Sequence, residues 1–136
     1  MILLDTHVWV WWVQGGGELS PKAIEFLDGA VESGIGVHVI SCWEVAMLHA
    51  GNRLSLPCHL DEWLDQALRY PGVQLMPLSR TVAVNACRLP GEIHRDPADR
   101  MLIAAAIELA CTLVTADKKI LAYEHVRSLH PDELES

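Results

Sequence analysis

Short apolar runs alternate with helix-like segments along this chain of 136 residues, and this alternation constrains the fold more than any other feature. Four of the runs are typical of buried strands: residues 2–4, 37–40, 73–76 and 111–114. A fifth strand is expected near residues 126–129. Parallel strands need crossover connections, which are usually helices. We therefore predict one domain over residues 1–136, folded as a three-layer α/β/α sandwich around a central, mainly parallel sheet.

Start signals mark several of the segments between these strands as helices. Ser20-Pro21 and Asp96-Pro97 each combine an N-cap residue with a proline at the first helical position. The helix that begins at Pro97 is apolar on nearly every face, so it should be central and buried. The other predicted helices cover residues 6–13, 21–31, 41–50, 59–69 and 79–88.

Acidic residues follow three of the predicted strands. Asp5 comes directly after the first strand, Glu44 lies in the first turn of the helix after the second, and Asp117 follows the fourth. Because sites in open α/β sheets form at the carboxyl ends of the strands, we expect these side chains at one edge. Asp99 lies in the first turn of the helix that leads to the fourth strand. It reaches this edge only if that helix begins close to it.

Carboxylates gathered at one edge repel each other, and a cation is needed to keep them ionised. No His-x3-His pair and no CxxC motif accompanies these acids. The expected ligands are therefore oxygens, which favour Mg²⁺ or Mn²⁺ over zinc. Since Mg²⁺ commonly takes substrate phosphates as further ligands, the natural chemistry is hydrolysis of a phosphodiester by a metal-activated water.

Each acid except one also has a plain structural interpretation at a helix start. Ser41 and Glu44 match a capping box. The acids that would serve as N-caps or complement a helix dipole are Asp96, Asp99 and Asp117. Asp5 is the exception, because Thr6 could fill any cap role there. The shared edge favours the metal interpretation for the whole set.

Four segments resemble, in this order, the four acidic motifs of PIN domains in the form found in VapC-type toxins of type II toxin–antitoxin pairs: ILLDTHVWVWW, SCWEVAML, HRDPADRMLIAAA and LVTADKKIL. The resemblance spans residues 1 to about 129. It implies an Mg²⁺- or Mn²⁺-dependent endoribonuclease, inhibited by a cognate antitoxin and commonly a homodimer. The catalytic, metal-binding acids that it implies are Asp5, Glu44, Asp99 and Asp117. Asp96 matches a frequent additional acid, and Thr115 matches a polar position that often supports the site.

The net charge of −8 has the wrong sign for an enzyme that acts on nucleic acid. A metal or a basic partner would have to neutralise part of it. Basic residues beside the acidic motifs are candidates for contacts with RNA phosphates, and solvated helix-end charges are the alternative: Arg95, Arg100, Lys118 and Lys119. Arg100 could also neutralise the acids when no metal is bound.

Other residues carry weaker signals. His94 could be a general base, but a metal-activated water needs none. Four tryptophans could stack on RNA bases, although packing in the core or against a partner is the simpler interpretation: Trp9, Trp11, Trp12 and Trp43.

Two other functions remain open: a catalytically inactive module that holds an ion, and a phosphotransfer protein phosphorylated on Asp5. A dehalogenase-type phosphotransferase would need an acid at His7, which argues against the second. No run is long and apolar enough to span a bilayer, and no secretion signal is recognisable. We therefore expect a cytoplasmic protein that is not associated with membranes.

Overall fold

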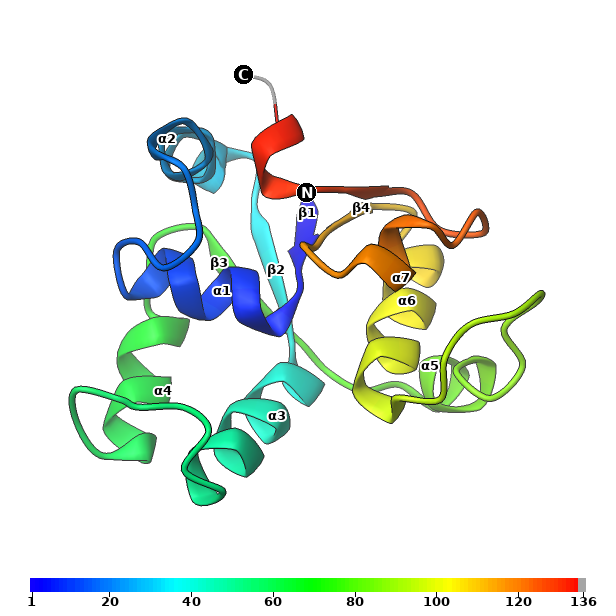
Figure 1. Cartoon of the computed structure of the whole chain (residues 1–136), viewed down its shortest axis with the longest axis horizontal. Helices are drawn as coiled ribbons and strands as arrows, with labels where there is room; N and C mark the ends of the chain where they lie inside the picture. Colours follow the sequence, from blue (N-terminus) through cyan, green and yellow to red (C-terminus); the bar gives the residue numbers. More distant parts are fainter. Residues whose placement is uncertain (135–136) are drawn as a thin grey trace.

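The computed structural model describes residues 1–134 and contains a five-stranded sheet in the order β3-β2-β1-β4-β5, with every neighbouring pair parallel. The strands are β1 (Ile2–Leu4), β2 (Ile35–His38), β3 (Val73–Met76), β4 (Thr112–Val114) and β5 (Ser128–Leu129). Figure 1 shows β1 near the middle of the molecule with helices on both sides of the sheet. The predicted parallel sheet is confirmed. Its second strand lies two residues earlier than expected.

Helices occupy every long connection between the strands. They are α1 (Thr6–Val13), α2 (Pro21–Gly29), α3 (Val39–Ala50), α4 (Leu60–Leu68), α5 (Arg80–Asn85), α6 (Pro97–Leu109) and α7 (Lys118–Leu121), with short 3₁₀ turns η1 (Ala30–Glu32) and η2 (Pro131–Glu133). The predicted helices are all present, with ends that differ by a few residues. No helix in the described part is long and apolar enough to cross a membrane.

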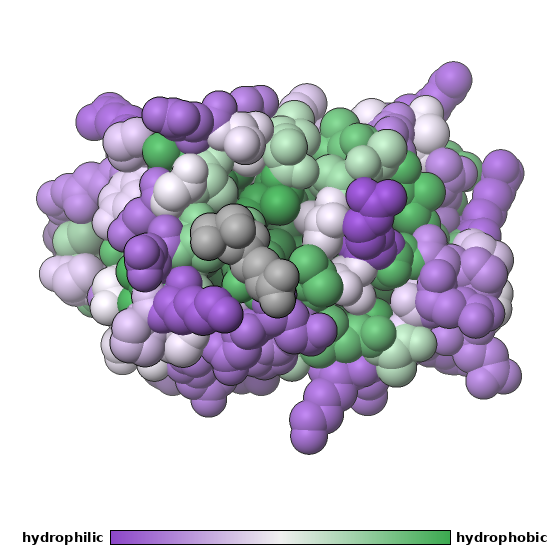
Figure 2. Space-filling view, turned by 90° about the horizontal axis from the view of Figure 1, so that it is seen from above, coloured by the Kyte–Doolittle hydropathy of each residue, from purple (hydrophilic) through white to green (hydrophobic). Residues whose placement is uncertain are grey.

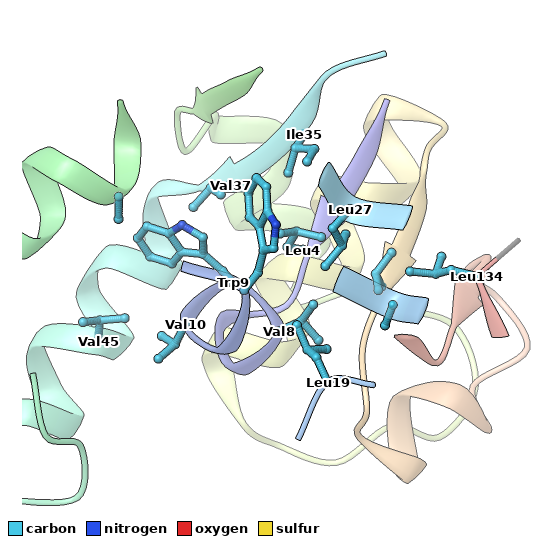
Figure 3. Close-up of a cluster of buried hydrophobic side chains, with 14 of the residues drawn as sticks. Leu4, Val8, Trp9, Val10, Leu19, Leu27, Ile35, Val37, Val45 and Leu134 are labelled. Atoms are coloured by element: carbon cyan, nitrogen blue, oxygen red, sulfur yellow. The ribbon is translucent and has the colours of Figure 1, made fainter. Parts of the chain in front are cut away.

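Successive side chains of the central strands point to opposite faces of the sheet, so the protein has two hydrophobic cores. On one face, Leu4 packs in a cluster with Trp9 of α1 and Leu27 of α2 (Figure 3). On the other face, Leu3 joins a cluster that is built largely from α6, including the fully buried Leu102. Both faces are therefore covered, which is the predicted α/β/α sandwich.

Helix α3 begins earlier than the sequence pattern predicts. The side chain of His38 caps it, because Nδ1 accepts a hydrogen bond of 3.0 Å from the backbone N–H of Ile40. Val39 and Ile40 are β-branched and were expected in the strand, but this cap places them in the helix. As a result, Glu44 lies in the second turn of α3. The capping box that we considered for Ser41 and Glu44 is therefore wrong.

The two ends of the sheet differ in chemistry. At the amino ends of the strands lies a hollow of about 700 Å³, lined by residues such as Ile2, Phe26 and Leu134. Viewed from this end, hydrophobic side chains gather near the centre of the surface, with hydrophilic ones around them (Figure 2). The acidic residues lie at the other end, where the carboxyl ends of the strands meet the helices.

Candidate active site

One cleft of about 450 Å³ brings together the acids that the sequence spreads over more than a hundred residues. The predicted acids in its lining come from the loop after β1, from α3, from the start of α6 and from the loop after β4: Asp5, Glu44, Asp96, Asp99 and Asp117. The central position of β1, between β2 and β4, places Asp5 among the others. The start of α6 also lies at this edge, which was the condition for Asp99 to join the other acids.

Asp5 is held by hydrogen bonds to both of its carboxylate oxygens. Oδ1 accepts from the backbone N–H of Thr6 at 2.7 Å, so Asp5 is itself the N-cap of α1, which corrects the expectation that Thr6 could fill this role. Oδ2 accepts from the hydroxyl of Thr115 at 2.6 Å. Burial raises the pKa of Asp5, and the hydrogen bond from Thr115 opposes that rise. Thr115 also accepts a bond from the N–H of Asp117 at 3.0 Å, which links two of the acidic segments.

Glu44 has one carboxylate oxygen that no hydrogen bond within residues 1–134 satisfies. It is buried, and its Oε1 has no hydrogen-bond partner among the described residues. Burial raises its pKa, a hydrogen bond with Thr6 opposes that rise, and the charge of Asp5 adds to it. Because buried polar atoms in native proteins are nearly always paired, an orphaned carboxylate oxygen beside other carboxylates fits a cation. Most of the potential metal ligands that line the cleft are carboxylate oxygens, the ligand type that Mg²⁺ and Mn²⁺ prefer, with His7 as the exception.

Asp99 pairs with a histidine from the preceding loop. Its Oδ2 lies 2.5 Å from Nε2 of His94, and its backbone N–H donates to Oδ1 of Asp96, the N-cap of α6, at 3.0 Å. Burial raises the pKa of Asp99 to about 6, against the lowering effect of the His94 hydrogen bond. One ligand atom each from His94, Asp99 and Asp117 lies within 4.8 Å of the others, which is close enough for a shared ion.

Asp117 caps a helix and lines the cleft at the same time. Its Oδ1 accepts from the backbone N–H groups of Lys119 and Ile120, at 2.8 and 3.1 Å, so it is the N-cap of α7. No hydrogen bond to its Oδ2 is found among the described residues. The prediction that Asp117 caps a helix is therefore confirmed. Its Oδ2 is left for another partner.

Comparison with known proteins places this arrangement in a family. The sequence model described as "PIN domain" matches residues 2–126. The chain belongs to the PIN-domain family. It is 35% identical over 126 residues to "Ribonuclease VapC22" of Mycobacterium tuberculosis, which covers 93% of this chain and 94% of that relative.

Solved structures agree with the PIN fold. FitAcB from Neisseria gonorrhoeae has a TM-score of 0.71 at 22% identity, covering 98% of this chain and 100% of that one. VapBC2 from Rickettsia felis, bound to a DNA fragment from its promoter, has a TM-score of 0.69 at 19% identity, covering 96% and 98%. At these identities the likeness concerns the fold, and it confirms the predicted sandwich.

The basic residues of this PIN domain take different positions. Three of them are exposed to solvent and lie next to or near acidic residues in the sequence: Arg95, Lys118 and Lys119. Arg100 instead donates hydrogen bonds to the carbonyl oxygens of Ala86, at 2.7 Å, and of Ile93 and His94, at 3.3 and 3.4 Å. It anchors the loop before α6 and does not line the cleft. The neutralising role expected for Arg100 in the absence of metal is therefore not what its contacts provide.

Further residues of the cleft wall were not predicted as part of the site: His7, Glu18, Met47, Leu48 and Arg53. Trp11 also lines the cleft, whereas Trp9 and Trp12 are buried in the core and Trp43 is 51% exposed. His7 and Trp11 are four residues apart in α1, and their ring centroids lie 6.1 Å apart. Their spacing after Asp5 was a usable signal, because it puts both rings on one face of the helix.

Proposed function

We propose that this PIN-domain protein is an endoribonuclease that depends on a divalent metal, Mg²⁺ with Mn²⁺ as the alternative, and that it acts as the toxin of a toxin–antitoxin pair. One observation carries the proposal: carboxylates from separate segments of the chain line a single cleft, and one buried oxygen among them, Oε1 of Glu44, lacks a hydrogen-bond partner among the described residues. The relative at 35% identity is named a ribonuclease, which supports the same activity here.

The ion would be held by the four acids, with Thr115 in a supporting role: Asp5, Glu44, Asp99 and Asp117. When bound, it would supply Lewis-acid activation of a phosphate oxygen and of the attacking water. The hydrogen bonds to Asp5 and Asp117 fix their carboxylates before any ligand arrives. Such fixed ligands lower the reorganisation that catalysis requires. Asp5 offers little to a phosphotransfer mechanism, since both of its oxygens already accept hydrogen bonds.

RNA would approach along the rim of the cleft. Arg53 lines the cleft, and exposed basic residues close in sequence to its acids are further candidates for phosphate contacts: Arg95, Lys118 and Lys119. The rings of His7 and Trp11 could stack on an unpaired base, which is how proteins commonly hold single-stranded RNA.

The direct test is cleavage of a panel of structured and unstructured RNAs by purified, antitoxin-free protein. Mg²⁺ or Mn²⁺ should support cleavage, and EDTA should abolish it. Asp5→Asn should be inactive, because it removes a charge but almost no volume. Asp65→Asn is the matched control, since Asp65 is exposed on α4 away from the cleft. Wild-type cleavage by Asp5→Asn would show that Asp5 is dispensable. Metal binding without cleavage of any RNA would favour an inactive module.

The proposed partners are a cognate antitoxin and a second copy of this chain. A basic antitoxin segment would match the net charge of −8. Exposed Trp43 and Met47 on α3 lie on the same helix as Glu44 and offer an apolar contact surface. A small upstream reading frame, growth arrest on expression and rescue by that frame would support the pair. Light scattering of the purified protein tests the homodimer, which rests on the family resemblance.

A further inference from the structure

One histidine–carboxylate pair differs from the others in its burial. The side chains of His94 and Asp99 are only 19% and 14% exposed, whereas each of the other pairs in residues 1–134 is formed by more exposed groups. His94 lies in the loop before α6, and its Nε2 is 2.5 Å from Oδ2 of Asp99. An exposed pair contributes little to stability, but a buried one fixes the geometry of both groups.

The proton of His94 can be placed by its surroundings. An ionised carboxylate only accepts hydrogen bonds, so Nε2 donates to Asp99. The other ring nitrogen, Nδ1, is buried without a partner, and a proton left there would be an unpaired buried donor. With its proton on Nε2, His94 is a donor to the carboxylate and has no lone pair on that atom to offer an ion.

The main chain of His94 is fixed as well. Arg100, the residue next to Asp99 in α6, donates to the carbonyl oxygens of His94 and Ile93. The same guanidinium bonds to the carbonyl oxygen of Ala86, at the end of α5. The loop is therefore tied to α6 twice, through the His94 side chain and through its backbone. This leaves the ring of His94 little freedom to turn away from Asp99.

We propose that His94 is a positioning residue that holds one oxygen of Asp99 so that the other faces the ion of the cleft. The inference rests on the proposed function, because it takes Asp99 as a ligand. A single N–H donor suits this task, since it fixes the direction of one carboxylate oxygen and leaves the other available to the ion. Partners of this kind typically change metal affinity by about 10–100-fold when they are removed.

The test is Mn²⁺ binding by calorimetry and electron paramagnetic resonance, with no RNA present. His94→Ala should bind Mn²⁺ about 10–100-fold more weakly than wild type. His94→Gln should recover most of the affinity, because its amide nitrogen can donate from nearly the position of Nε2. His59→Ala is the control, since His59 is exposed and makes no capping hydrogen bond. Thermal melts in EDTA show whether each variant is folded.

The outcomes separate this inference from the proposed function. If wild type binds Mn²⁺ and folded His94→Ala binds it equally well, the positioning role is wrong and the metal site stands. If the bound Mn²⁺ shows nitrogen coupling that His94→Gln removes, His94 is a ligand, which also overturns the proposal. If wild type binds no Mn²⁺, the proposed metal site fails and takes this inference with it. The proposal is supported if His94→Ala binds Mn²⁺ weakly, His94→Gln restores the affinity, and the bound Mn²⁺ shows no nitrogen coupling.

Discussion

Replacing Asp99 with asparagine should stabilise the metal-free protein at neutral pH and remove its ability to hold a divalent ion. The substitution keeps the shape of the side chain and an oxygen that can accept from Nε2 of His94. It removes the negative charge that burial disfavours, near the charges of Asp5 and Asp96. Stability and metal binding should therefore change in opposite directions.

The size of the effect follows from the pKa of Asp99, which burial raises from 3.8 to about 6. Each pKa unit corresponds to about 1.4 kcal/mol, so keeping Asp99 ionised in the folded state costs up to about 3 kcal/mol. A raised carboxyl pKa means that the folded state binds more protons than the unfolded state between these two values. Stability of the wild type therefore falls as the pH rises from about 4 to about 6. The gain from asparagine should be nearly complete above pH 7, about half at pH 5 and small below pH 4.

Thermal melts in EDTA at pH 7.5 and pH 5 measure this gain. For a chain of this length, about 3 kcal/mol corresponds to a rise in Tm of roughly 10 °C. Asp65→Asn makes the same charge change on an exposed part of α4 and should leave Tm nearly unchanged. Added Mn²⁺ should raise the Tm of wild type but not of Asp99→Asn. A lower Tm for metal-free Asp99→Asn at pH 7.5, or an equal gain at both pH values, would refute the reasoning.

Three other substitutions test separate parts of the site. Thr115→Val removes the donor to Asp5 and should destabilise the protein by about 1–3 kcal/mol in urea unfolding, because it leaves buried polar atoms unpaired; an unchanged midpoint would contradict this. Arg100→Gln breaks the bonds that tie the loop to α6, so faster hydrogen exchange is expected at residues 86–94, and unchanged protection would rule out an anchor. Trp43→Ser should weaken antitoxin capture without altering RNA cleavage by the free protein; equal capture would place the antitoxin elsewhere.

Sequence patterns were sufficient to predict the three layers of the fold and the edge of the sheet at which the acids lie. The alternation of apolar runs and helices fixed the parallel topology, because few other folds bury such short strands on both faces. The same logic located Asp5, which directly follows β1, and Asp117, which comes three residues after the end of β4. The position of Asp99 depended on where α6 begins. The Asp96-Pro97 start signal predicted correctly that this helix begins at Pro97.

What the sequence could not provide were contacts that join distant segments. The cap of α3 by His38 is not a common N-cap, so strand propensity gave the wrong boundary there. Arg53 follows α3 and reaches the cleft through the path of a loop, which no local pattern encodes. Arg100 was expected to be a partner of the acids because it is adjacent to Asp99. Its guanidinium instead donates hydrogen bonds to backbone carbonyl oxygens between residues 86 and 94.

In the proposed function, the charge of the cleft would link metal binding to RNA binding. If the four acids proposed as ligands are ionised, they carry a charge of −4, and one divalent ion leaves −2 in a cleft that Glu18 and Asp96 also line. Arg53 lines the cleft, and Lys118 and Lys119, which follow Asp117 in the sequence, are exposed. An RNA phosphate would therefore need further cations, or these basic side chains, as counter-charges in the cleft. Because an ion that neutralises the carboxylates lowers their repulsion of the phosphates, occupancy of the proposed ion site would favour access of an RNA substrate.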